Sequence, residues 1–191
     1  MSTEALAVGA PARPSTGRVL ANFAAFQIGW FACVLGAAHG APWLGIGVTA
    51  LVVAWHLVAA AQPGVEARLI VIVAMLGAIW DSALVALGWI DYASGTIVAG
   101  AAPGWIVAMW ALFATTLNVS LNWLKGRDWL AVAFGSIGGP LAFYGGAKLG
   151  AVSFPQPLFA LGALAIGWAI LTPILTRLAT HFNGVNRNPV R

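Results

Sequence analysis

The stretch that decides the fold runs from residue 69 to residue 90 and reads LIVIVAMLGAIWDSALVALGWI. Asp81 is the one acidic or basic side chain within it. An α-helix needs roughly 20 mainly apolar residues to cross the ~30 Å hydrocarbon core of a bilayer. The segment has that length and composition, so it predicts a transmembrane helix with a carboxyl group inside the membrane.

Apolar segments of similar length lie on both sides of this one. They cover about residues 19–38, 43–62, 104–124, 129–148 and 157–177, and turn sequences rich in Gly and Pro separate them. We expect an all-α fold, a polytopic membrane bundle of about six transmembrane helices over residues 19–178. Residues 1–18 are predicted to form a disordered cytoplasmic tail and residues 179–191 a second cytoplasmic tail. Residues 96–102 favour a loop or an interfacial segment.

Composition supports the same class. Hydrophobic residues make up 61% of the 191 residues and charged residues 7%, against roughly 45–50% and 25% in soluble globular domains. The net charge of +4 does not indicate nucleic-acid binding, because the basic residues are scattered singly between hydrophobic segments and form no patch with aromatics.

The basic residues instead predict an orientation. If the N-terminus is cytoplasmic, the loops and tails on that side hold eight basic residues and the opposite loops hold Lys148. The positive-inside rule favours this arrangement. We therefore expect a multi-pass protein of the bacterial inner membrane with both termini in the cytoplasm. The eight are Arg13, Arg18, Arg68, Lys125, Arg127, Arg177, Arg187 and Arg191.

Polar residues inside the spans are the candidates for a site. Asp81 follows Leu69 by 12 residues, which places it roughly 18 Å along the helix and close to the bilayer centre. A charged Asp there costs about 2.5–3.5 kcal/mol, so it should have a partner or be protonated. His56, Asn118, Asn122 and Gln27 lie in the predicted cytoplasmic half. A cytoplasm-facing polar pocket around Asp81, lined by these four side chains, would explain the pattern. Separate interhelical hydrogen bonds explain it equally well.

The fourth and fifth spans carry further patterns. Thr115, Asn118 and Asn122 are three and four residues apart, which predicts one face of a helix. In the fifth span, small residues recur every four positions, a spacing that favours close packing of another helix, and a mid-span proline predicts a kink. These small residues are Gly138, Ala142, Gly146 and Gly150, and the proline is Pro140.

No motif predicts a metal site, a cofactor or a known catalytic centre. Cys33 is the single cysteine, and His56 has no His or Cys at metal-ligand spacing. There is no Gly-x-Ser-x-Gly sequence and no Gly-rich phosphate loop. We therefore expect no metal and no cofactor, and the residues lean against an enzyme.

Four segments give the chain a resemblance to a known family. They are NFAAFQIGWFACVLGA, WDSALVALGWI, PGWIVAMWALFATTLNVSLNWL and GSIGGPLAFYGGAKLGA. The chain resembles, over about residues 20–178, an uncharacterised bacterial multi-spanning inner-membrane family, a domain of unknown function of roughly 170 residues. The genes of that family often lie near those for fatty-acyl-modifying methyltransferases, so the resemblance implies a role connected with membrane lipids. It assigns no catalytic residue.

Three functions are compatible with these observations. The first is the handling of a lipid or small molecule, as a permease or flippase, through the polar pocket around Asp81. The second is a non-enzymatic scaffold that recruits a lipid-modifying enzyme to the membrane through the inner loops. The third is an intramembrane enzyme that acts on acyl chains. The sequence does not predict the oligomeric state.

Overall fold

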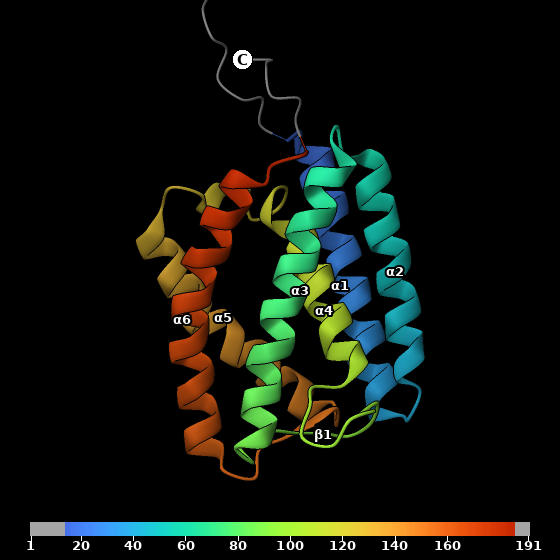
Figure 1. The fold of residues 1–191 in the computed structure, drawn as a ribbon, viewed down its shortest axis with the longest axis vertical. Helices are drawn as coiled ribbons and strands as arrows, with labels where there is room; N and C mark the ends of the chain where they lie inside the picture. The colour runs from blue at the N-terminus through green and yellow to red at the C-terminus, as the bar shows by residue number, and fades with distance from the viewer. Residues whose placement is uncertain (1–13, 186–191) are drawn as a thin grey trace, which may run out of the picture.

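The computed structural model describes residues 14–185. These residues form a bundle of six α-helices (Figure 1). Five of the helices are long and apolar enough to cross a membrane, which confirms the all-α membrane fold. The elements are α1 (Thr16–Ala38), α2 (Pro42–Ala59), α3 (Pro63–Ala86), β1 (Asp91–Tyr92), α4 (Gly104–Leu117), the 3₁₀ helix η1 (Asn122–Leu124), α5 (Asp128–Lys148), β2 (Val152–Ser153) and α6 (Pro157–His181).

The helices begin and end where local chemistry requires. Proline occupies the first helical position of α2, α3 and α6, where its missing N–H costs nothing. Ser15 caps α1 by accepting a hydrogen bond from the backbone N–H of Arg18. Helix α1 begins at Thr16 and α6 continues to His181, so in the described part of the chain each helix extends three residues into a predicted tail. Residues 1–13 and 186–191 lie outside it.

The predicted continuous helix over residues 104–124 is wrong. Helix α4 ends at Leu117 after 14 residues, about 21 Å at 1.5 Å per residue, and a turn leads into η1. Asn22 of α1 holds this end of α4: its Nδ2 donates to the carbonyl of Thr115 (3.1 Å), and its Oδ1 accepts from the Ser120 hydroxyl (2.8 Å). Consequently Thr115, Asn118 and Asn122 do not share one helical face.

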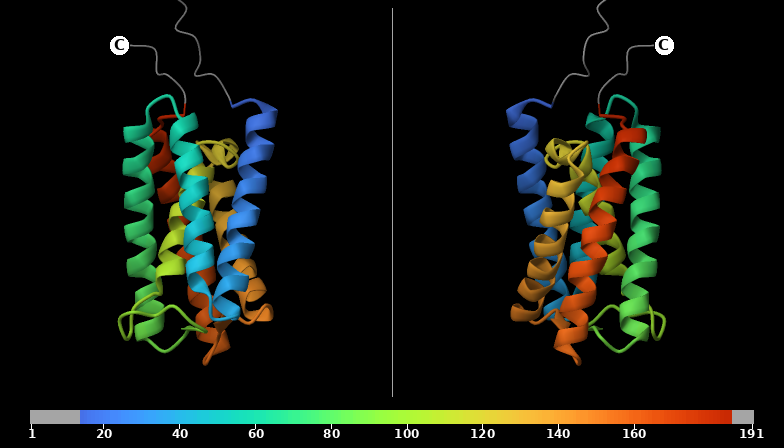
Figure 2. Two further views of the ribbon diagram at one scale, coloured as in Figure 1. Left: turned by 90° about the vertical axis from the view of Figure 1, so that its right-hand side faces the viewer. Right: turned by 90° about the vertical axis from the view of Figure 1, so that its left-hand side faces the viewer.

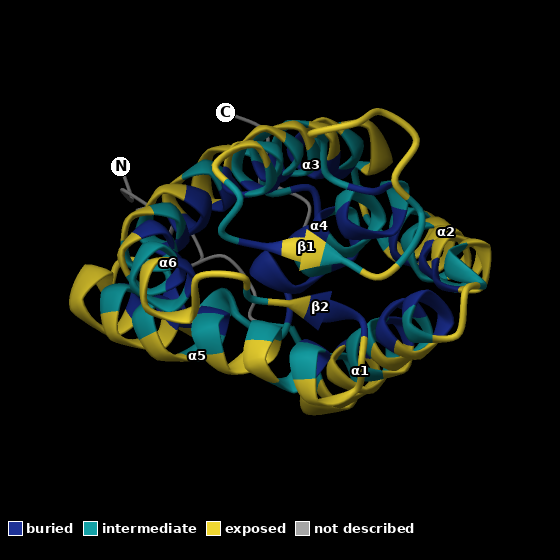
Figure 3. Cartoon of the chain, turned by 90° about the horizontal axis from the view of Figure 1, so that it is seen from below, coloured by how far each residue is buried: buried dark blue, intermediate teal, exposed yellow. Residues whose placement is uncertain are grey.

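Helix α4 lies inside the bundle and the other five helices surround it (Figure 3). Helix α1 packs on α2, α3 on α4, and α5 on α6, while α2 and α1 also pack on α4. Helix α1 begins and α6 ends at the same end of the bundle (Figure 2). We call this the terminal end. At the opposite end β1 pairs antiparallel with β2, with Asp91 opposite Ser153 and Tyr92 opposite Val152. We call this the sheet end.

The long connection between α3 and α4 is a loop, as expected for residues 96–102, which contain no helix or strand. It is anchored at three points. The Ser94 hydroxyl donates to the carbonyl of Ala37 (2.7 Å), the indole of Trp105 donates to the Ser94 carbonyl (3.0 Å), and the N–H of Ala102 donates to the Ser82 hydroxyl (2.9 Å). The loop therefore closes the sheet end over α1 and α3.

Glycine allows large aromatic side chains of one helix to pack directly on the backbone of the next. A Cβ at Gly77 of α3 would lie 2.0 Å from the Trp110 ring, and one at Gly167 of α6 would lie 2.2 Å from Trp80. Such close approach through small residues is a main source of helix association in membranes, where apolar burial drives it little.

Candidate functional site

Asp81 is fully buried and both of its carboxylate oxygens are bonded. Oδ1 accepts from the Tyr92 hydroxyl of β1 (2.8 Å), and Oδ2 accepts from the indole Nε1–H of Trp110 on α4 (2.5 Å). Burial first, and then the Asp81 charge, raise the pKa of Tyr92 well above its usual value, so this hydroxyl keeps its proton and can donate. Asp81 thus joins α3, β1 and α4. Its side chain faces the interior of the bundle, as expected because a carboxylate exposed to hydrocarbon would be energetically costly.

A second polar cluster surrounds Glu66, in the first turn of α3 at the terminal end. Its carboxylate is fully buried and accepts three hydrogen bonds: from His56 Nε2 (2.7 Å), from Asn118 Nδ2 (2.6 Å) and from the Gly184 N–H (2.7 Å). Because a carboxylate only accepts, the His56 proton lies on Nε2. Glu66 therefore ties together α2, α3, the end of α4 and the segment after α6.

Lys125 extends this cluster from the loop between η1 and α5. Its ammonium donates to the Asn118 side-chain oxygen and to the carbonyl of Ala179 on α6 (3.2 Å). Burial lowers the pKa of Lys125 to about 8, and the attraction of Glu66 partly opposes this effect. The cluster therefore holds a basic group that the structure has partly removed from solvent.

The five side chains predicted to form one pocket do not lie together. Asp81 and Glu66 are 15 positions apart on α3, roughly 22 Å along the helix, and His56 and Asn118 bond to Glu66. Gln27 and Asn122 are half-buried, and we find no side-chain hydrogen bond from either to a residue within 14–185. A polar pocket around Asp81 that includes all five is therefore not present.

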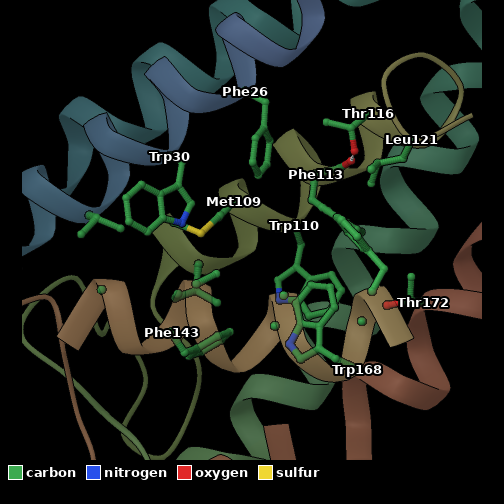
Figure 4. A pocket seen from close by; sticks show the side chains of 18 of the residues that line it. Phe26, Trp30, Met109, Trp110, Phe113, Thr116, Leu121, Phe143, Trp168 and Thr172 are labelled. Atoms are coloured by element: carbon green, nitrogen blue, oxygen red, sulfur yellow. Dashed lines mark hydrogen bonds between the residues drawn. The ribbon is translucent and has the colours of Figure 1, made fainter. Parts of the chain in front are cut away.

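The structure instead contains an apolar cavity between α1, α4, α5 and α6, with a volume of about 210 Å³ (Figure 4). None of the five predicted site residues lines it. Nine of its 22 lining residues are aromatic, and the stacked pair Trp110 and Trp168 (ring centroids 4.8 Å apart) forms one wall. The aromatic lining residues are Phe23, Phe26, Trp30, Trp105, Trp110, Phe113, Phe134, Phe143 and Trp168.

Small residues of α5 form part of the cavity wall. Gly138, Ala142 and Gly146, predicted to receive another helix, line the open space. The close contact with α6 uses a different face: a Cβ at Gly139 would lie 2.2 Å from the Trp168 ring, and one at Gly135 would lie 2.2 Å from Thr172 Oγ1. The small-residue stripe thus widens the cavity, and the packing prediction for it is wrong.

The cavity reaches the lateral surface of the bundle between α1 and α5. Phe23 of α1 and Phe134 of α5 both line the cavity, and they are 55% and 41% exposed on the outer surface. Phe134 and Gly146 are 12 positions apart on α5, about 18 Å along the axis. This length is about three-fifths of the ~30 Å hydrocarbon core. Both α1 and α5 are long and apolar enough to cross a membrane, so an opening between them would face lipid chains if both helices span the bilayer.

The lining holds no ionisable side chain. Its polar members are the hydroxyl residues Thr116, Ser120 and Thr172. Two of these hydroxyls have protein partners, since Thr116 donates to the Phe113 carbonyl and Ser120 to Asn22. Among residues 14–185, no group of three or more His, Cys, Asp or Glu side chains is placed to hold a metal ion.

Sequence reasoning missed the parts that Glu66 and Lys125 take in the buried polar cluster. Glu66 lies between the predicted spans 43–62 and 69–90, whereas α3 begins at Pro63 and contains it. A proline three residues before a carboxylate, at the start of an apolar helix, was the available signal. The cavity had no sequence signal, because it depends on how far α5 stands from α1.

The fold and these features define a multi-pass helical membrane protein with an apolar cavity inside the bundle. The chain belongs to the family described as Protein of unknown function (DUF2878), whose model matches residues 19–174. This confirms the resemblance to an uncharacterised domain family. No curated protein and no solved structure gave a significant match to the chain.

Proposed function

We propose that this protein handles membrane lipids by binding an apolar lipid chain in the cavity between α1, α4, α5 and α6. The observation that carries the proposal is an apolar cavity, rich in aromatic side chains, that reaches the lateral surface of the bundle between α1 and α5. Ligand sites are concave and mostly apolar, with few polar groups. Burial of apolar surface would not by itself favour this cavity over lipid, so shape and aromatic contact must supply the affinity.

The charge distribution supports a chain rather than a charged head group as the occupant. The lining contains no side chain of opposite charge to pair with an ion inside the cavity. The desolvation of an unpaired charge therefore costs more free energy than contacts with this apolar lining can offset. Asp81, proposed from the sequence as the central ligand group, has a different role here. It fixes the indole of Trp110 and thereby one wall of the cavity.

A cavity-filling variant tests the proposal. A Cβ at Gly138 meets nothing closer than Phe134 of its own helix, at 3.9 Å, so Gly138→Phe can place a ring in the cavity without displacing backbone. We expect this variant to lose most of the photo-crosslinking to a phospholipid with a diazirine within its acyl chain. In the parent protein, crosslinked peptides should include the cavity-lining segments of α1, α4 and α5.

Gly162→Phe is the matched control. Gly162 lies on α6 outside the cavity lining, and no atom lies within 4 Å of its Cβ position. This variant should crosslink as the parent protein does. Labelling confined to outward-facing residues, and equal in the parent and Gly138→Phe, would contradict the proposal. Thermal unfolding of all three proteins in detergent checks that each is folded.

A further inference from the structure

The cavity is open toward one end of the bundle and closed toward the other. Phe23 and Phe134, which line it nearer the terminal end, are 55% and 41% exposed. The lining residues nearer the sheet end are at most 8% exposed, and they include Val34, Trp105 and Val152. The exposure of the lining therefore falls along the bundle axis, and the cavity ends blindly near the sheet end.

The path of α5 relative to α1 explains this difference. A Cβ at Gly145 of α5 would lie 3.5 Å from the Trp30 ring of α1, and one at Gly150, just after α5, would lie 3.8 Å from Ala38. Nearer the terminal end, the Cβ position of Gly138 has no atom of the described part of α1 within 4 Å. Figure 1 shows α5 approaching α1 toward the sheet end. The two helices therefore diverge toward the terminal end, and the Trp30 ring closes the gap between them nearer the sheet end.

The open part of the cavity lies in the half of the bundle nearer the terminal end. Helix α1 has 23 residues, about 34 Å at 1.5 Å per residue, which is close to the ~30 Å hydrocarbon core. Phe23 is 7 positions after Thr16, and Phe134 is 6 positions after Asp128. Both therefore lie roughly 10 Å along their helices from the terminal end, at the depth of one leaflet.

This geometry allows a lipid with a polar head group to bind in one direction. The head group must stay outside, because the lining described above has no ionisable side chain to pair with a charge. The hydroxyl residues Thr116 and Ser120 of the lining lie at the end of α4 that is nearer the terminal end. Toward the sheet end the lining is apolar and closed, which suits the methyl end of a chain.

We propose that the cavity takes its lipid from the membrane leaflet at the terminal end. An acyl chain enters between Phe23 and Phe134 with its methyl end toward Val152, and the head group stays at the terminal-end surface. The inference rests on the proposed function, because it assigns the leaflet and the direction of the chain that the cavity binds. A cavity that is blind toward the sheet end holds a chain and provides no path between leaflets.

Photo-crosslinking of the protein in phospholipid nanodiscs tests the direction. The two probes are phosphatidylcholines that differ only in the position of a diazirine, beside the ester or beside the methyl end of one chain. The methyl-end probe should label Val34 and Val152. The near-ester probe should spare both and label Phe23 and Phe134. Leu35 is the internal control: it is 41% exposed beside Val34, so the near-ester probe should label it from the leaflet at the sheet end.

Removal of the Trp30 ring tests the closure between α1 and α5. Trp30→Ala should open this gap, so that the near-ester probe gains labelling of Val34. Trp55→Ala is the matched control, because Trp55 of α2 is 43% exposed and does not line the cavity, and it should label as the parent protein does. Thermal unfolding in detergent checks that both variants are folded. A folded Trp30→Ala protein without this gain would overturn the assignment of Trp30 as the closure.

The outcomes separate the inference from the proposed function. Labelling of Val34 and Val152 in the parent protein by the near-ester probe, or equally by both probes, overturns the inference and leaves lipid binding intact. If neither probe labels any buried lining residue of the folded parent protein, the proposed function is overturned as well.

Discussion

At the scale of single residues, hydrogen-bond donors from other segments fix the positions of the two buried carboxylates. Glu66 accepts from three donors on three segments, and Asp81 accepts from two. Removal of a carboxylate leaves its donors buried and unpaired, at about 1–3 kcal/mol for each group. These residues therefore act mainly on the stability of the bundle.

We predict that Glu66→Ala lowers the free energy of unfolding by roughly 3 kcal/mol or more, because it leaves three buried donors unpaired. Glu66→Gln should cost about 1 kcal/mol or less, because its amide oxygen can still accept from Asn118 and Gly184, and its NH₂ can donate to the other tautomer of His56. Thermal unfolding in detergent measures both variants. Equal effects of the two would contradict the role assigned to the carboxylate.

The sequence was informative about which polar residues are buried and less so about their partners. Asp81 was correctly expected to need partners, because an unpaired charge is costly at membrane depth. Its donors, Tyr92 and Trp110, lie 11 and 29 positions away in the chain, and no local spacing connects them to it. Tertiary packing decides which donors reach a buried carboxylate, and the sequence does not specify this packing. The five predicted site residues therefore lie in different parts of the structure.

At the scale of elements, hydrophobic length predicted five helices well and one poorly. The apolar run over residues 104–124 suggested a full span, but its last part contains the hydrogen-bonding side chains that end α4 at Leu117. Helix α5 shows the same limit. Its glycines predicted a packing face, but only the structure shows which of its two glycine-containing faces contacts α6.

Adjacent glycines of α5 should therefore respond differently to the same substitution. Gly139→Ala should destabilise the protein by about 1–3 kcal/mol, because the new methyl group overlaps the Trp168 ring. Gly138→Ala should stay within about 1 kcal/mol of the parent protein, since its methyl group enters the cavity. Chemical or thermal unfolding in one detergent compares them, and a similar loss in both would contradict the assignment of the two faces.

At the scale of the whole molecule, the terminal end carries Arg18, Lys125 and Arg177. Arg18 donates to the carbonyls of Ala59 and Val185, and Arg177 pairs with Asp128 at 2.5 Å. This clustering of basic residues supports, through the positive-inside rule, a cytoplasmic location for the terminal end, which we propose.

Cysteine labelling in spheroplasts tests the orientation. In a Cys33→Ser background, which contains no other cysteine, Ala99→Cys in the loop at the sheet end should react with a membrane-impermeant maleimide. Arg127→Cys, between η1 and α5, should react after lysis. Both positions are exposed in the structure. Labelling of Arg127→Cys in intact spheroplasts, with Ala99→Cys protected, would reverse the proposed orientation.

The pairing of β1 with β2 has a consequence for biosynthesis. Asp91 meets Ser153 across 62 positions of sequence, and the Ala93 N–H donates to the carbonyl of Ala151. Because synthesis starts at the N-terminus, β1 cannot pair with β2 until α4 and α5, which lie between the two strands in the chain, have been synthesised. The sheet end is therefore completed only after β2 has been synthesised, and the Tyr92 segment has no strand partner while α4 and α5 are being made.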